Sequence, residues 1–277
     1  MVDSTPNAAL LLIHGRPTGS WNQPFAFPGE AAQGRGFLQD RMTPANQNLF
    51  HVTHAKAGST WIADILSTAF GERTFRRFGR RTEHYEWAPG RVYPAIFLPR
   101  EEFFSLAGTA NQPVFFVLRD VRDAMVSLYF SLRYTHTTEG FPHIVKFREE
   151  VAGMSDGEGL LHTLRTRHSE IQRIQESWLE SGSEVVRYED LIASGGSLLT
   201  EVFDRIGFSY DREILSRAIA ANSFEAKFGR ALGEVDERSH GRQGLPGDWR
   251  RYATDELVEF TETTLRGTLE KGGYSLS

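Results

Sequence analysis

The chain has 277 residues, 40% of them apolar, so it is long enough to bury the core of one α/β domain of ordinary size. Its formal net charge of -5 argues against a general nucleic-acid-binding protein. The sequence contains no cysteine, which excludes disulfides and thiolate metal sites and is compatible with a reducing compartment. We therefore expect a cytoplasmic protein with no membrane span and no nucleic-acid partner.

The first 45 residues are rich in Gly, Pro, Asn and Gln, and we expect them to form an N-terminal arm of the same domain that residues 46–277 build. Their one apolar run, Ala9–Ile13, is too short to span a membrane. With the following His14-Gly15 it resembles the oxyanion strand of α/β-hydrolases, but such an enzyme needs a G-x-S-x-G nucleophile elbow. The sequence has no such pentapeptide, so this run is predicted to be a small strand or arm over one end of the core.

A short polar turn follows the apolar run Leu49–Val52 and leads into a helical segment, Trp61–Phe70. A strand, a tight turn and a helix in this order would point backbone N–H groups, the helix dipole and the Lys56 ammonium at one anion. Phosphate or sulfate is the natural ligand of such a turn. The alternative is an ordinary strand-to-helix connection in which Ser59 is the N-cap.

Strands and helices alternate through the rest of the chain. Apolar runs predict strands at Arg91–Pro99, where Pro94 requires an edge or a strand start, and at Val114–Leu118 and Glu184–Leu191. Helical periodicity predicts helices at Val121–Ser131, Gly157–Leu179, Leu198–Ile206, Ile214–Ala221 and Thr254–Leu269. This alternation indicates an α/β fold with a central, mainly parallel sheet flanked by helices, in which ligands bind beyond the carboxyl ends of the strands.

Two further segments carry groups that suit an anion. Arg119 follows the predicted strand Val114–Leu118 and Ser127 lies on the helix after it, although Arg119 could instead pair with Asp123 and Ser127 could be a small packing residue. The segment Gly241–Tyr252 is a glycine-rich loop with arginines, and its glycines let backbone N–H groups approach a ligand closely.

Five motifs in this order resemble those of the cytosolic-type sulfotransferases, which use 3'-phosphoadenylyl sulfate (PAPS) as sulfuryl donor and release 3',5'-adenosine bisphosphate (PAP). They are K-x-G-x-x-W from Lys56, R-x-x-x-D-x-x-x-S from Arg119, Tyr-Glu-Asp from Tyr188, Ser-Phe from Ser223 and R-x-G-x-x-G-D-W from Arg242. The resemblance runs from about Leu49 to the C-terminus. It implies one sulfotransferase domain over residues 46–277, with the phosphate-loop-like architecture that nucleoside kinases share and with no metal requirement.

The resemblance assigns a catalytic role to Lys56, since a point cation stabilises the negative charge that grows as the sulfuryl group leaves. The family's 5'-phosphosulfate loop is matched by Ala57, Gly58, Ser59 and Thr60. Its 3'-phosphate ligands are matched by Arg119, Ser127, Arg242 and the Gly244 backbone, with Gln243 where the family has Lys. Its adenine site is matched by Trp61, Tyr188 and Phe224, and Ser223 lies in the same motif as Phe224.

The general base is the main departure from the family pattern. Much of the family has a His in a K-T-H-L-P-like strand, whereas the region taken as comparable here, Arg91–Pro94, has none. The candidates are His84 first, because a His has the most suitable pKa at neutral pH, and then His136, Tyr93, Glu86 and Glu101. The family's dimerisation motif is also missing from residues 233–240, which leaves the oligomeric state open.

Phenylalanine-rich segments such as Phe103-Phe104 suit an apolar alcohol or phenol as the small-molecule acceptor, although the same residues could simply be core. Two other functions stay open. A nucleotide-dependent kinase on a related fold would need G-x-x-x-x-G-K-[ST], which the sequence lacks. A nucleotide-binding module would keep the phosphate contacts but have lost the base.

Overall fold

The computed structural model describes residues 46–75, 87–236, 239 and 242–276, so the predicted N-terminal arm lies outside the described residues. Its centre is a four-stranded sheet in the order β2-β1-β3-β4, and all three strand pairs are parallel. The strands are β1 (Leu49–Thr53), β2 (Val92–Ile96), β3 (Val114–Leu118) and β4 (Val185–Arg187). The predicted α/β fold with a central parallel sheet is confirmed.

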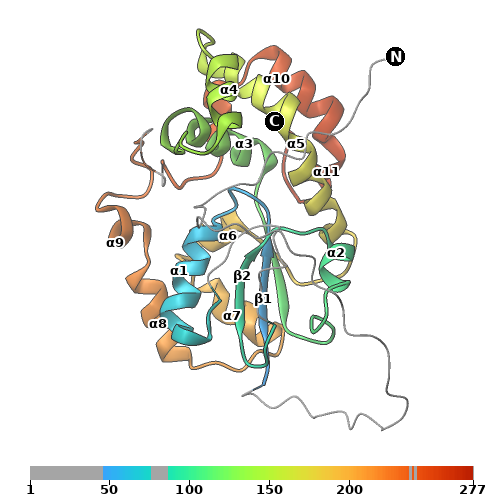
Figure 1. Cartoon of the computed structure of the whole chain (residues 1–277), viewed down its shortest axis with the longest axis vertical. Coiled ribbons are helices and arrows are strands. Elements are labelled where there is room, and N and C mark those ends of the chain that lie inside the picture. Colours follow the sequence, from blue (N-terminus) through green and yellow to red (C-terminus); the bar gives the residue numbers. More distant parts are fainter. Residues whose placement is uncertain (1–45, 76–86, 237–238, 240–241, 277) are drawn as a thin grey trace.

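Helices cover both faces of this sheet, because successive side chains of a strand point to opposite sides. Phe50 and Phe116 belong to one buried core, and their neighbours Leu49 and Phe115 belong to the other. Helices α1 and α8 lie on one side of the sheet and α2 on the other (Figure 1). In chain order the helices are α1 (Ser59–Phe70), α2 (Arg100–Phe104), α3 (Val121–Phe130), α4 (Pro142–Glu150), α5 (Asp156–Leu179), α6 (Tyr188–Ala193), α7 (Leu198–Arg205), α8 (Arg212–Ala221), α9 (Phe224–Phe228), α10 (Asp255–Phe260) and α11 (Arg266–Lys271).

The strand β2 lies at the edge of the sheet, as Pro94 predicts, because proline has no N–H to donate to a second neighbour. Its pairing with β1 shifts between Phe50 and Val52, and Ala95 takes a left-handed φ of 60° at this irregularity. The Ala95 N–H donates to His51 Nδ1 at 3.2 Å instead of to a strand carbonyl. The backbone N–H at this bulge is therefore paired with a side chain instead of a neighbouring strand.

Two predicted elements differ in the structure. The strand predicted over Glu184–Leu191 ends at Arg187, because beyond this residue the Asp120 N–H donates to the Glu189 carboxylate and no longer to a strand backbone. The last helix is divided into α10 and α11 by a π-helical turn, Thr261–Leu265. A second π-helical turn, Ser131–Thr135, extends α3. Within the described ranges, no helix combines the length and apolar character needed to cross a membrane.

Candidate functional site

The turn between β1 and α1 is tightly curled. Lys56 and Gly58 have left-handed φ values of 69° and 76°, and Gly58 occupies the N-cap position of α1 without a side-chain cap bond. The alternative with Ser59 as N-cap is therefore wrong, and the first N–H groups of α1 have no side-chain cap to compete with an anion. A Cβ on Gly58 would lie 2.7 Å from Cε2 of Tyr188, so only glycine lets this turn pack against that ring.

Lys56 reaches from this turn to the π-helical end of α3. Its Nζ donates to Ser131 Oγ at 3.1 Å, and this hydroxyl lies 2.8 Å from Nδ1 of His136. Burial, and secondarily the nearby Arg119 guanidinium, lower the pKa of Lys56 to about 8. An anion beside Nζ would favour the ammonium form of Lys56, so binding of a negatively charged group at this position is electrostatically favourable.

Arg119 leaves the carboxyl end of β3 and closes the turn from the other side. Its Nη1 donates to the Lys56 carbonyl oxygen at 3.0 Å, and its guanidinium lies 4.6 Å from the centre of the Tyr188 ring. Its Nε is buried and has no hydrogen-bond partner among the described residues. A buried donor of this kind normally has a partner, which is what a bound phosphate would supply.

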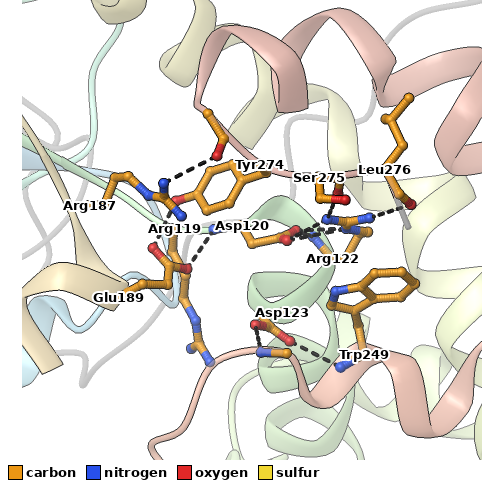
Figure 2. Close-up of polar contacts among 12 residues, drawn as sticks. Arg119, Asp120, Arg122, Asp123, Arg187, Glu189, Trp249, Tyr274, Ser275 and Leu276 are labelled. Carbon is orange, nitrogen blue, oxygen red and sulfur yellow. Dashed lines mark hydrogen bonds and ion pairs between the residues drawn. The ribbon is translucent and has the colours of Figure 1, made fainter. Parts of the chain in front are cut away.

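The structure gives the Asp123 carboxylate hydrogen-bond partners other than Arg119. Asp123 accepts hydrogen bonds from the backbone N–H groups of Gly247 at 2.6 Å and Trp249 at 3.0 Å (Figure 2). These two bonds fasten the glycine-rich loop to α3, which carries Ser127. The acid of the R-x-x-x-D-x-x-x-S motif is thus a loop anchor.

A buried histidine joins the ends of β1 and β3. His54 Nε2 accepts from the Arg119 N–H at 3.2 Å, while Nδ1 donates to the Ala55 carbonyl oxygen at 2.9 Å. Gln175, on α5, donates to the Arg119 carbonyl oxygen at 2.7 Å. Burial lowers the pKa of His54 to about 4, so the imidazole is neutral at pH 7 and serves to position Arg119.

A second buried network lies behind Arg119 and holds the end of the described chain in place. Arg122 pairs with Asp120 at 2.7 Å and donates to the carbonyl oxygen of Leu276 at 3.1 Å. Glu189 accepts from the Asp120 N–H and from the Tyr274 hydroxyl at 2.8 Å (Figure 2). The backbone that directly follows Arg119 is therefore fixed from both sides.

The glycine-rich loop packs against α9 and the Tyr188 ring. Tyr188 Oη donates to the Gly244 carbonyl oxygen at 3.1 Å, and a Cβ on Gly244 would lie 2.9 Å from the Phe224 ring. Arg242 pairs with Asp248, and its guanidinium lies 4.7 Å from the centre of the Phe130 ring. The Nε of Arg242 is buried without a partner among the described residues, as is Arg119 Nε. Each of these two arginines, which are among six with such a buried nitrogen in the described residues, thus keeps one unpartnered donor at the site.

Side chains from these elements line one cavity of about 440 Å³. Among the predicted nucleotide-binding residues, those that line it are Gly58, Ser59, Thr60, Trp61, Arg119, Ser127, Tyr188, Ser223, Phe224, Arg242, Gln243 and Gly244. Lys56 and His136 line it as well. Ala57 is fully buried and does not. The described part of the chain has no group of three or more His, Asp or Glu residues placed to hold a metal ion.

The candidates for a general base differ in whether they line the cavity. His136 lines the cavity, whereas Glu101 is exposed on α2 and Tyr93 is buried, with its hydroxyl on the backbone of Ala88. His84 and Glu86 lie outside the described residues.

Phe97, which follows β2, lines the cavity and is missed by the motif comparison. The segment Ala95–Pro99 keeps the final Leu-Pro of the K-T-H-L-P-like strand, so it matches that strand better than Arg91–Pro94 does. This match puts Phe97 at the position of the family's His. The shared Leu-Pro is the signal that could have found it.

The solved structures that share this fold include two with bound PAP. Mouse sulfotransferase SULT7A1 complexed with PAP matches with a TM-score of 0.58 and 16% identity, over 82% of this chain and 88% of that chain. Retinol dehydratase in a complex with retinol and PAP matches with a TM-score of 0.50 and 16% identity, over 83% of this chain and 82% of that chain. No protein-family model and no curated protein sequence matches the chain. The chain therefore has the fold of the sulfotransferases.

Proposed function

We propose that the chain is a PAPS-dependent sulfotransferase that transfers a sulfuryl group to a hydroxyl or amine of a small molecule by in-line displacement. The observation that carries the proposal is one cavity with two sets of anion-binding groups. Lys56 and the turn before α1 form the first set, and Arg119, Ser127 and Arg242 form the second. A donor with a phosphosulfate and a second phosphate across an adenosine has an anion for each set. The PAP that is bound in structures of the same fold supports this choice.

The residues present fit such a donor. The buried, unpartnered Nε atoms of Arg119 and Arg242 are suited to the 3'-phosphate, because an arginine fork can bind two phosphate oxygens. The aromatic rings of Trp61, Tyr188 and Phe224 would form the walls around the adenine.

The donor supplies an activated sulfuryl group whose leaving group is a phosphate. The Lys56 ammonium and the N–H groups at the start of α1 stabilise charge that is larger in the transition state than in the ground state. Because Lys56 already donates to Ser131, it is held in the cavity before a ligand binds. Preorganisation of this kind lowers the reorganisation needed during the reaction.

We infer an apolar alcohol or phenol as the acceptor class, since Phe97 adds an aromatic wall to the cavity that His136 also lines. The absence of cysteine fits a cytoplasmic setting. We assign the nucleotide and acceptor sites to one domain, residues 46–277.

The test is to incubate the purified chain with PAPS and a panel of 2-naphthol, p-nitrophenol, retinol and androsterone, and to detect sulfated products by mass spectrometry. We expect PAP release with a sulfated product, and we expect Lys56→Met to abolish turnover while PAP still binds. Wild-type binding of PAP without turnover would indicate a binding module. Stronger thermal stabilisation by ATP than by PAP would indicate a kinase. If the chain neither binds PAP nor forms a sulfated product, the proposal is refuted.

A further inference from the structure

The Ser131 hydroxyl connects Lys56 to His136, a residue to which the proposed nucleotide site gives no role. Ser131 Oγ lies 3.1 Å from Lys56 Nζ and 2.8 Å from His136 Nδ1. Lys56 and His136 line the same cavity, and Ser131 is buried between them at 5% exposure. The cation that would face the leaving group and an imidazole are therefore held in one unit.

The π-helical turn Ser131–Thr135 creates this unit. Its wider winding lets the His136 N–H donate to the Ser131 carbonyl oxygen at 2.8 Å, five residues back instead of four. The imidazole then folds over the same turn, with Nδ1 3.0 Å from that carbonyl oxygen. Arg148 fixes the other end of the residue by donating to the His136 carbonyl oxygen at 2.7 Å.

This geometry selects a tautomer. A backbone carbonyl oxygen only accepts hydrogen bonds, so Nδ1 of His136 carries the proton in its contact with Ser131. The basic nitrogen is then Nε2, on the edge of the ring away from Ser131. A neutral imidazole that is fixed in this way is suited to take a proton from a hydroxyl group.

A second residue of the cavity lining supports the same assignment. Phe97 occupies the position where the family pattern has its histidine, and its side chain carries no titratable group. Of the described candidates for a base, Tyr93 and Glu101 do not line the cavity. If this cavity binds the reacting groups, the base must come from an element other than β2 and the segment after it. The π-helical turn after α3 provides His136.

We propose that His136 is the catalytic base on the acceptor side and that Ser131 holds it in register with Lys56; this rests on the sulfotransferase function proposed above. A bond forms between the acceptor oxygen and sulfur while the bond from sulfur to the bridging phosphate oxygen breaks. The acceptor proton goes to Nε2 of His136. The electron pair of the broken bond goes to the phosphate oxygen, whose charge the Lys56 ammonium stabilises.

The first test is His136→Asn, because the Asn amide can still donate to the Ser131 carbonyl oxygen but cannot act as a base. PAP affinity is measured by calorimetry, and PAP release from PAPS is measured with 2-naphthol and with water as acceptors. We expect PAP affinity within about twofold of wild type and transfer at least about 100-fold slower, the lower end of general-base contributions. The matched control is His143→Asn, on α4 outside the cavity, which should change neither quantity.

The second test reads the tautomer without turnover. Long-range ¹H–¹⁵N spectra of the histidine-labelled wild type at pH 7.5 are compared with those of His136→Asn to assign the His136 signals. We expect a neutral ring with the proton on Nδ1. A proton on Nε2, or a charged ring, would overturn the assignment. A His136→Asn variant with transfer within about threefold of wild type would overturn it too, because that loss is far smaller than the contribution of a general base. If the wild type neither binds PAP nor consumes PAPS, the proposed function fails and the base assignment with it.

Discussion

PAP binding should be coupled to the protonation of Lys56. Burial and the Arg119 guanidinium lower the pKa of this lysine to about 8 in the unliganded protein. A phosphate beside Nζ stabilises the ammonium and raises the pKa again. Below about pH 8 the lysine is already charged and takes up no proton on binding. Above this pH, each PAP molecule that binds takes up a proton at Lys56.

The size of the effect follows from linkage. Between the pKa of the free protein and that of the complex, the dissociation constant for PAP rises about tenfold for each pH unit. With a free pKa of about 8, binding at pH 9 should be about tenfold weaker than at pH 7, which corresponds to about 1.4 kcal/mol. An ordinary surface lysine stays charged throughout this range, so it would give no change in PAP affinity between pH 7 and pH 9.

The assay is isothermal titration calorimetry with PAP at pH 7, 8 and 9, each in two buffers of different ionisation enthalpy. The difference in heat between the buffers gives the number of protons taken up. Lys56→Met is the control, and it should bind PAP more weakly with no change between pH 7 and pH 9. Equal wild-type affinity at both pH values, or the same pH dependence in Lys56→Met, would refute the reasoning that Lys56 contacts the anion.

Three further variants test the residues that hold the backbone of the site in place. Gly58→Ala places a Cβ 2.7 Å from a tyrosine ring at a φ of 76°, so urea titration should show a free energy of unfolding lower by about 1–3 kcal/mol, and an unchanged value would contradict this. Asp123→Asn replaces a carboxylate oxygen that accepts from the glycine-rich loop, so calorimetry should show PAP affinity at least about fivefold weaker, whereas Asp255→Asn on α10 should leave it unchanged. Arg122→Met leaves the buried Asp120 without its cation and should lower the free energy of unfolding by about 3–5 kcal/mol, and a loss below about 1 kcal/mol would show that water already screens the pair.

The positions of Lys56 and Arg119 at the carboxyl edge of the sheet could be predicted because the signal for each is local in sequence. A continuous apolar run such as Val114–Leu118 indicates a buried parallel strand, and the residue after it must lie at the carboxyl edge of the sheet. This places Arg119 without knowledge of its neighbours. Lys56 follows β1 for the same reason.

The parts that could not be predicted depend on contacts far apart in the chain or on an irregular backbone. His54 contacts Gln175, 121 positions later, and no pattern in the sequence links the two. The unit of Lys56, Ser131 and His136 depends on a π-helical turn, which helical periodicity does not distinguish from a continued α-helix. The helix that begins at Tyr188 could not be predicted for another reason, since it follows β4 directly, with no turn residue between the two elements.

The central claim is a nucleotide site with a dedicated place for a second phosphate. It is tested most directly by measuring the affinities of PAP and adenosine 5'-monophosphate for the wild-type chain in calorimetry at pH 7. In the proposed complex, loss of the 3'-phosphate would remove hydrogen bonds from Arg119 and Arg242, each worth about 1.5–3 kcal/mol for a charged group. The monophosphate should therefore bind at least about 100-fold more weakly than PAP. Equal affinity for the two nucleotides would contradict the account.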